Sequence, residues 1–192
     1  MIKPFFKQKI LLASQSPRRQ FLLKESGFDI EPIKIDVEEN FDTKLMAQEI
    51  PLFLAKKKAN AYTKEIENNQ LLVTADTIVW LNNKVLNKPL DMHEAKAMLQ
   101  ELSNNSHSVY TAVNVKSNNK EISFYDESKV YFNELNEQII NHYLEHYSPL
   151  DKAGAYGIQE FIGFVGIKRI EGCYYNVMGF PVSKFIEEIN KL

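Results

Sequence analysis

The amino-acid sequence predicts a mixed α/β or α+β protein built as one domain. The prediction comes from short apolar runs typical of buried strands, from apolar residues at helical spacing, and from the partial alternation of the two along the chain. With 192 residues the chain is long enough to bury one sizeable core. The sequence contains neither an internal repeat nor a long Gly/Ser linker. We therefore expect a single domain over residues 1–192.

The expected elements follow from apolar patterning and turn residues. The apolar run at 10–13 predicts the first strand, and Ser16 followed by Pro17 predicts the start of a helix that extends to about residue 26. Further helices are expected at 51–67, 92–102 and 136–146, and a closing helix is expected at 181–192. Strands or extended segments are expected at 28–37, 71–80, 109–115, 123–132 and 164–170. Residues 148–157 read as a loop of small residues.

Composition excludes several functional classes. A net charge of -2 argues against a general binder of nucleic-acid polymers, so any phosphate site must be a local basic cluster. No run approaches the roughly 20 apolar residues of a membrane span, and MIKPFFKQK at the N-terminus is too polar for a signal peptide. Cys173 is the single cysteine and cannot form an internal disulfide, which favours a reducing, cytoplasmic compartment.

Two adjacent arginines, Arg18 and Arg19, fall in the first turn of the helix that Ser16 is expected to cap. Cations are unfavourable there, because a helix N-terminus carries partial positive charge. An anion would offset this cost, since free backbone N–H groups and two guanidinium groups would converge on it. Ser14 adds a hydroxyl, and phosphate matches arginine geometry. The alternative is that both arginines simply point into water.

A carboxylate interrupts the apolar run LLVTADTIVW at residues 71–80. Burying Asp76 is costly unless it is paired, hydrogen-bonded or bound to metal, so it is a candidate general base or metal ligand. An acidic cluster at 36–39 ends an earlier segment, and acidic groups from two segments suit a hard divalent cation. A structural aspartate in a turn and a solvated acidic run are the alternatives.

Two lysines and one glutamine are further candidates. Lys58 lies in the LAKKKANA helix, and Lys88 precedes a proline in LNKPL, which biases its backbone to be extended. Gln159 ends the small-residue loop DKAGAYGIQ, and its amide can both donate and accept, as reading a base edge requires. Ordinary surface lysines and an ordinary turn are the alternatives.

The stretch from His142 to His146 matches H-x-x-E-H, an inverted zinc-peptidase pattern. Both histidines could face one metal, but no third ligand is evident in the sequence. We expect His93 and His107 at the surface or as helix-capping residues.

Seven motifs together resemble the Maf family of nucleotide pyrophosphatases, first described as septum-formation proteins. They occur in the family's order: LASQSPRR, VEEN, LAKKKANA, TADTIVWLNNKVLNKP, HSVYTAV, DKAGAYGIQ and YYNVMGFPVS. The resemblance spans about residues 10–189. It implies an α/β fold like that of inosine triphosphate pyrophosphatases (Maf/Ham1), with an elongated, curved mixed sheet flanked by helices around a central cleft. It also implies a divalent metal, Mg²⁺ or Mn²⁺, and a homodimer.

The resemblance also implies roles for individual residues. The phosphate site would contain one hydroxyl and four basic side chains: Ser14, Arg18, Arg19, Lys58 and Lys88. Glu39 and Asp76 would hold the metal, with Asp76 as the proton acceptor and Glu39, Lys58 and Lys88 completing the catalytic set. Arg18, Thr77 and Gln159 match the positions that mark the dTTP/UTP subgroup; the related 7-methyl-GTP subgroup has Trp in place of the first arginine.

The expected activity is hydrolysis of dTTP, UTP or modified pyrimidine triphosphates to the monophosphate and pyrophosphate. A nucleotide-binding regulator of cell division that needs no turnover is the alternative. The pair of acidic candidates favours the enzyme, because binding phosphate alone would not favour buried carboxylates.

Overall fold

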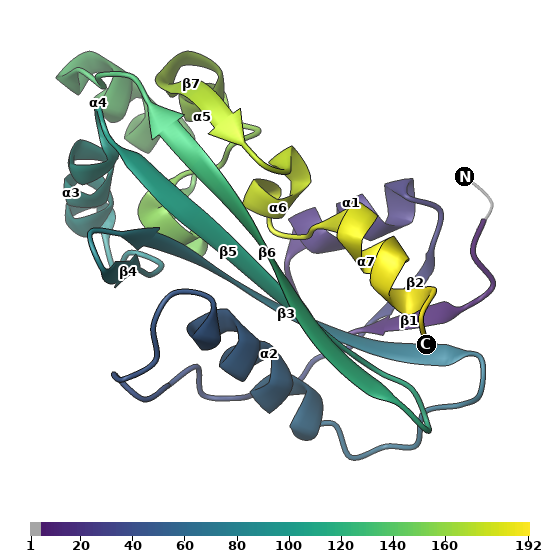
Figure 1. Ribbon diagram of the computed structural model, residues 1–192. Helices are drawn as coiled ribbons and strands as arrows, with labels where there is room; N and C mark the ends of the chain where they lie inside the picture. The colour runs from purple at the N-terminus through teal and green to yellow at the C-terminus, as the bar shows by residue number, and fades with distance from the viewer. Residues whose placement is uncertain (1–4) are drawn as a thin grey trace. The chain divides into compact units, whose positions relative to one another are not determined.

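The computed structural model describes residues 5–192 and confirms the mixed α/β class, with a seven-stranded mixed sheet flanked by helices in this part of the chain (Figure 1). The strand order is β2-β1-β3-β5-β6-β7, with β4 paired to β3. The chain groups into two compact units, and three long strands contribute to both: β3 (Gln70–Leu81), β5 (Ser106–Lys116) and β6 (Glu121–Phe132). The single domain over 1–192 stays a prediction, and its residues 1–4 lie outside the described part.

Unit 1 comprises the chain up to Asp76 together with Thr111–Asp126 and Gly179–Leu192. β1 runs parallel to both β2 and β3, so the ends of β1 and β3 lie at one edge, with Leu12 beside Val73. Helices α1 and α7 cover one face of this part of the sheet, and α2 covers the other (Figure 1). Besides its share of the long strands, the unit contains β1 (Lys9–Leu12), α1 (Pro17–Glu25), β2 (Asp29–Pro32), α2 (Glu49–Asn60) and α7 (Val182–Ile189).

Alternating side chains let the central strands of unit 1 fill two apolar layers. Leu11 and its register partner Leu72 pack with Ala59 of α2. Their neighbours along β1 point to the opposite face, where Phe28 and Phe185 of α7 meet edge to face at 5.4 Å. Because β1 is buried on both sides, the segment that leaves it is fixed against β3, and the Ala13 N–H donates to the Val73 carbonyl at 2.9 Å.

Unit 2 comprises Thr77–Tyr110 and Glu127–Met178. Its core packs α3 and α4 with the ends of the long strands, and side-chain caps fix where both helices begin: Asp91 accepts from the Glu94 N–H and Asn136 from the Ile139 N–H. Besides the long strands, the unit contains β4 (Lys84–Leu86), α3 (Met92–Leu102), α4 (Glu137–His146), the 3₁₀ turns η1 (Pro149–Asp151) and η2 (Ala153–Ala155), α5 (Phe161–Gly166), β7 (Ile167–Glu171) and α6 (Tyr174–Met178).

Three expected elements differ clearly from the structure. The helix expected at 51–67 ends at Asn60 as α2. The strand expected at 164–170 is wrong over its first half, because residues 161–166 form α5 and the antiparallel strand β7 begins only at Ile167. The extended segment expected at 28–37 is a strand only at Asp29–Pro32. Pro32 is tolerated at its last position because β2 is an edge strand and the missing N–H of proline faces away from β1, while the Ile33 N–H still donates to the Leu12 carbonyl at 2.9 Å.

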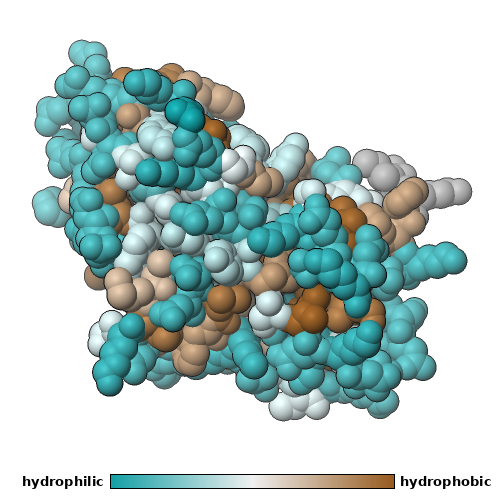
Figure 2. Space-filling model, viewed as in Figure 1, coloured by the Kyte–Doolittle hydropathy of each residue, from teal (hydrophilic) through white to brown (hydrophobic). Residues whose placement is uncertain are grey.

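The surface in view is mostly hydrophilic, with apolar residues in small separate groups (Figure 2). This pattern fits a chain in which 25% of the residues are charged. Within residues 5–192, no helix is both long enough and apolar enough to span a bilayer.

Candidate active site

The segment Ser14–Arg19 links β1 to α1 and confirms the expected helix start. The Ser16 side chain caps α1 by accepting from the Arg19 N–H at 3.5 Å, and Pro17 occupies the first turn. The Ser14 hydroxyl in turn accepts from the Ser16 N–H at 3.2 Å. Ser14 therefore lies against the helix N-terminus, where unsatisfied N–H groups favour anions.

Arg19 joins three segments of unit 1 that are far apart in sequence. Its Nε donates to the Gly179 carbonyl at 2.9 Å, and its Nη1 donates to the Ala75 carbonyl at 2.9 Å and to Ser14 Oγ at 3.3 Å. These acceptors offset part of the cost of a cation at the helix start. Burial lowers the pKa of the Arg19 guanidinium, and the nearby Asp76 carboxylate opposes that shift. Since arginine ordinarily titrates above pH 12, we treat the guanidinium as charged.

A lysine and two carboxylates lie near Arg19. We call the group of Ser14, Arg19, Lys58, Asp76 and Glu39 the unit 1 cluster. Lys58 Nζ lies 2.6 Å from Asp76 Oδ1 and 2.6 Å from Glu39 Oε1. The Asp76 and Lys58 side chains are only 11% and 14% exposed, whereas Glu39 is half exposed. One ammonium thus bridges two carboxylates that come from different segments.

The neighbouring elements explain why Lys58 reaches Asp76. Thr74 donates from Oγ1 to the Ala55 carbonyl at 2.6 Å, which ties α2 to β3. Asp76 follows Thr74 by two residues and shares its face of the strand, and Lys58 follows Ala55 by three and shares its face of the helix. Lys57 points elsewhere, since its Nζ lies 3.1 Å from the Asn40 carbonyl. Thr74 could not be singled out from the sequence, because threonine is common in strands.

Electrostatics set Asp76 apart from an ordinary surface carboxylate. Burial raises the pKa of Asp76, and the positive charges of Lys58 and Arg19 oppose the shift. A raised pKa moves the carboxylate toward the range in which a general base works best near neutral pH. Asp76 can therefore both hold a cation and accept a proton.

Three other predicted residues belong to unit 2. Thr77 follows Asp76 on β3, Lys88 lies exposed between β4 and α3, and Gln159 ends the 151–159 loop. The Gly154 N–H of that loop donates at 3.2 Å to the carbonyl of Asn87, the residue before Lys88. Gln159 Oε1 is buried and has no hydrogen-bond partner among the described residues, so a donor on a ligand would relieve an unsatisfied acceptor.

His107 corrects the expectation of a surface or capping residue. It is buried at 2% exposure, and its Nε2 lies 2.7 Å from the hydroxyl of Tyr156 in the 151–159 loop. Phe132 stacks on its ring. A buried imidazole was not predictable from HSVYTAV, because only the pairing with Tyr156 makes its burial tolerable.

The burial of His107 predicts a loss of stability in acid. Burial lowers the pKa of His107 to about 3, so below pH ~6.5 the unfolded chain binds a proton that the folded chain does not. The free energy of unfolding should therefore fall with pH by up to about 1.4 kcal/mol per unit between these values. Urea unfolding of wild type and His107→Leu at several pH values measures this; equal slopes in the two proteins would contradict the prediction.

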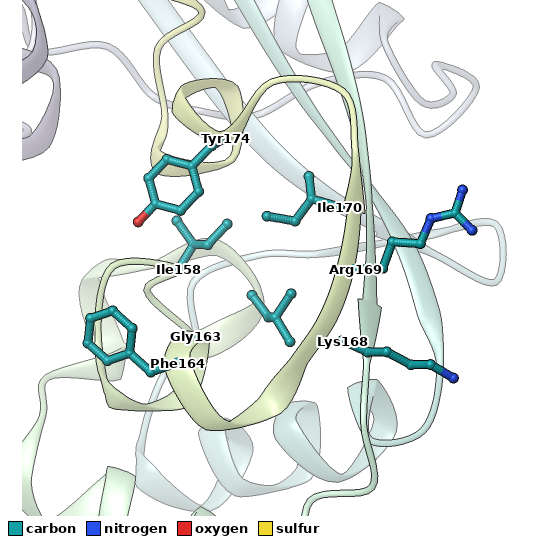
Figure 3. Close-up of a pocket in the computed structure, with 8 residues that line it drawn as sticks. Ile158, Gly163, Phe164, Lys168, Arg169, Ile170 and Tyr174 are labelled. Atoms are coloured by element: carbon teal, nitrogen blue, oxygen red, sulfur yellow. The ribbon is translucent and has the colours of Figure 1, made fainter.

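An apolar pocket of about 290 Å³ lies between α5, β7 and α6 of unit 2 (Figure 3). Ile158, Phe164 and Tyr174 line it, while the side chains of Lys168 and Arg169 extend away from it (Figure 3). None of the predicted site residues lines this pocket, so it is separate from the candidate site.

The zinc-peptidase pattern finds no support. The rings of His142 and His146 stack at 4.3 Å, and His146 Nδ1 lies 2.9 Å from the His142 carbonyl oxygen. In the part of the chain that the structure describes, no three His, Cys, Asp or Glu side chains are grouped to hold a metal. The pattern therefore lacks the third ligand that zinc requires.

The fold and the unit 1 cluster define a class of protein: a mixed α/β protein in which basic side chains of α1 and α2 lie beside two carboxylates, a set suited to polyphosphate chemistry. A family model described as Maf-like protein matches residues 9–192. This chain belongs to the Maf family.

Curated relatives agree with this assignment. A dTTP/UTP pyrophosphatase of Cytophaga hutchinsonii is 50% identical over 183 residues, covering 95% of this chain and 84% of the relative. Another of Parabacteroides distasonis is 45% identical over 190 residues, covering 98% of each. Among solved structures, the Staphylococcus aureus Ham1 protein aligns with a TM-score of 0.42 at 14% identity, over 65% of this chain and 72% of that one.

Proposed function

We propose that this protein hydrolyses dTTP and UTP to their monophosphates and pyrophosphate. The observation that carries the proposal is the Lys58 ammonium held at 2.6 Å by both Asp76 and Glu39. A general base, a cation for phosphate and a carboxylate pair for a divalent ion thus occur in one cluster. Relatives that are 44% to 50% identical and are named dTTP/UTP pyrophosphatases support the same activity.

In the proposed reaction a water molecule attacks the α-phosphorus. Asp76 accepts a proton from this water as the new P–O bond forms, and the bond from the α-phosphorus to the bridging oxygen breaks to release pyrophosphate. Basic side chains bind the phosphates and hold their charge: Arg18, Arg19, Lys58 and Lys88, with the Ser14 hydroxyl beside Arg19. Such catalysis depends on positioning and on fixed charge.

A divalent cation fits the residues present. Asp76 and Glu39 supply oxygen ligands and already share one bound cation, the Lys58 ammonium. Mg²⁺ is commonly held by one or two carboxylates with substrate phosphates and water completing its shell, and Mn²⁺ accepts the same donors. When bound, the metal would neutralise charge on the phosphates.

The family resemblance assigns selection of the base to Arg18, Thr77 and Gln159. Thymine and uracil carry an N3–H donor, and the unpartnered Gln159 Oε1 is an acceptor that could receive it after the amide turns toward the base. A homodimer and a cytoplasmic location belong to the same proposal, supported by the family resemblance and by the single cysteine.

The test is a pyrophosphate-release assay with Mg²⁺ or Mn²⁺ over the eight canonical nucleoside triphosphates and modified pyrimidine triphosphates. We expect release from dTTP and UTP at least tenfold faster than from purine triphosphates, because even one methylene discriminates between substrates by about tenfold or more. Nucleotide binding by calorimetry without any release would replace the enzyme by the nucleotide-binding regulator.

A further inference from the structure

The residue proposed to select the base lies in a tight turn of unit 2. The Glu160 N–H donates to the Gly157 carbonyl at 3.0 Å, which closes a four-residue turn over residues 157–160. Gln159 occupies the third position of this turn. The placement of its amide therefore depends on what holds the turn.

One buried hydroxyl contacts both ends of the turn. Tyr143 of α4 has no exposed surface, and its hydroxyl accepts from the Gly157 N–H at 3.0 Å and donates to Glu160 Oε2. Glu160 is fixed from its other side as well, because Lys152 Nζ lies 3.1 Å from Glu160 Oε1. The hydroxyl thus bridges the first and last residues of the turn, with Gln159 between them.

The hydroxyl keeps its proton, which this arrangement requires. Burial, with a further contribution from the Glu160 carboxylate, raises the pKa of Tyr143 above its ordinary value of 10.0. The Tyr143 hydroxyl therefore remains a donor to Glu160 over the whole range in which the protein would work. Its oxygen stays available as the acceptor for the Gly157 N–H.

The turn is in close contact with the side chain of Glu160 and with α5. A Cβ added at Gly157 would lie 2.6 Å from the Glu160 carboxyl group, so Glu160 rests directly on Gly157. On the far side, a Cβ at Gly163 of α5 would lie 1.9 Å from the Ile158 carbonyl oxygen. Both Ile158 and Gly163 also border the apolar pocket (Figure 3). The turn is thus clamped between α4 and α5.

We propose that Tyr143 is a positioning residue that fixes the 157–160 turn so that Gln159 is held ready to meet the pyrimidine base. This inference rests on the proposed function, and it assigns to α4 a role that the H-x-x-E-H pattern does not suggest. Tyr143 itself touches no reacting atom. Its removal should weaken substrate binding without changing the chemical step.

The test compares the steady-state kinetics of wild type and Tyr143→Phe with dTTP. We expect Tyr143→Phe to raise KM about tenfold, because the Gly157 N–H and the Glu160 carboxylate lose their shared partner and the substrate must then restore the turn, and to change kcat less than about threefold. Loss of folded enzyme would act in the opposite way, lowering the apparent kcat at constant KM. The matched control is Tyr147→Phe, which removes a hydroxyl oxygen from a residue whose ring stacks on Tyr143 with centroids 5.1 Å apart. We expect its KM and kcat to equal those of wild type.

A second set of variants connects the effect to Gln159. In a Gln159→Ala background, Tyr143→Phe should raise KM no further, because coupled positions are not additive. Glu160→Ala removes the carboxylate that accepts from the Tyr143 hydroxyl, and it should reproduce the increase in KM. If Tyr143→Phe does not fold, the KM of Glu160→Ala tests the proposal in its place.

The possible outcomes separate the two proposals. Wild type that releases no pyrophosphate from dTTP overturns the proposed function and this inference with it. Wild type that is active, with KM unchanged in Tyr143→Phe and Glu160→Ala, overturns the inference alone. An increase in KM that is fully additive with Gln159→Ala also overturns it, because Tyr143 would then act elsewhere.

Discussion

Asp76→Asn is expected to lower kcat for dTTP hydrolysis by about 10³-fold, within the 10²- to 10⁴-fold contribution typical of a general base. Asparagine has nearly the same shape, and its Oδ1 can still accept from the Lys58 ammonium that lies 2.6 Å from Asp76. It cannot take a proton from water. We therefore expect a folded protein that still binds the nucleotide, measured by calorimetry, and that releases pyrophosphate about 10³-fold more slowly than wild type.

The same role predicts an acid limb in the pH profile of wild-type kcat/KM. The base must be ionised, so activity falls as pH drops through the pKa of Asp76. Because burial raises that pKa, the limb should lie above the ordinary aspartate value of about 3.9. Asp126→Asn is the matched control, since Asp126 pairs with Lys184 at 3.7 Å outside the cluster and should leave the profile unchanged. Full turnover by Asp76→Asn would remove Asp76 from its assigned role.

Sequence reasoning succeeded where the signal is local. Ser16 and Pro17 mark the start of α1 because capping and a preset φ act within a few residues. The apolar run of β3 identified a buried strand, and the carboxylate within it proved buried and paired. It failed at residues 164–166, which were expected in a strand but belong to α5, a six-residue helix without a side-chain cap whose apolar and β-branched residues also suit a strand.

The contacts that complete the candidate site were beyond sequence reasoning because they are long-range or involve the backbone. Arg19 donates to the backbone carbonyl oxygens of Ala75 and Gly179, and a motif of side chains does not identify a carbonyl acceptor. Tyr143 lies inside a pattern that suggested zinc, and its relevance appears only when the turn at 157–160 is folded against it. The predicted side chains were therefore accessible from motifs, whereas the residues that position them were not.

Lys58→Met should be the most destabilising of the proposed changes, because it leaves the buried Asp76 carboxylate without its partner. Removing one member of a buried ion pair costs about 3–5 kcal/mol in unfolding free energy. Lys57→Met is the matched control on the same helix. Lys57 contacts Asn40 in an exposed position, and replacing it should change the unfolding free energy by less than about 0.5 kcal/mol. Urea unfolding at neutral pH measures both variants.

The physical reason can be tested by removing the charge that Lys58 balances. In Lys58→Met the pKa of Asp76 should rise further above its unfolded value, so the folded state binds a proton that the unfolded state lacks. Stability of the variant should then increase as pH falls through the folded pKa, the opposite of the His107 effect. Asp76→Asn introduced into Lys58→Met should recover most of the lost unfolding free energy, because no unpaired carboxylate remains. Additive losses in the double variant would show instead that the loss in Lys58→Met does not depend on the charge of Asp76, and that the ion pair between them adds little to stability.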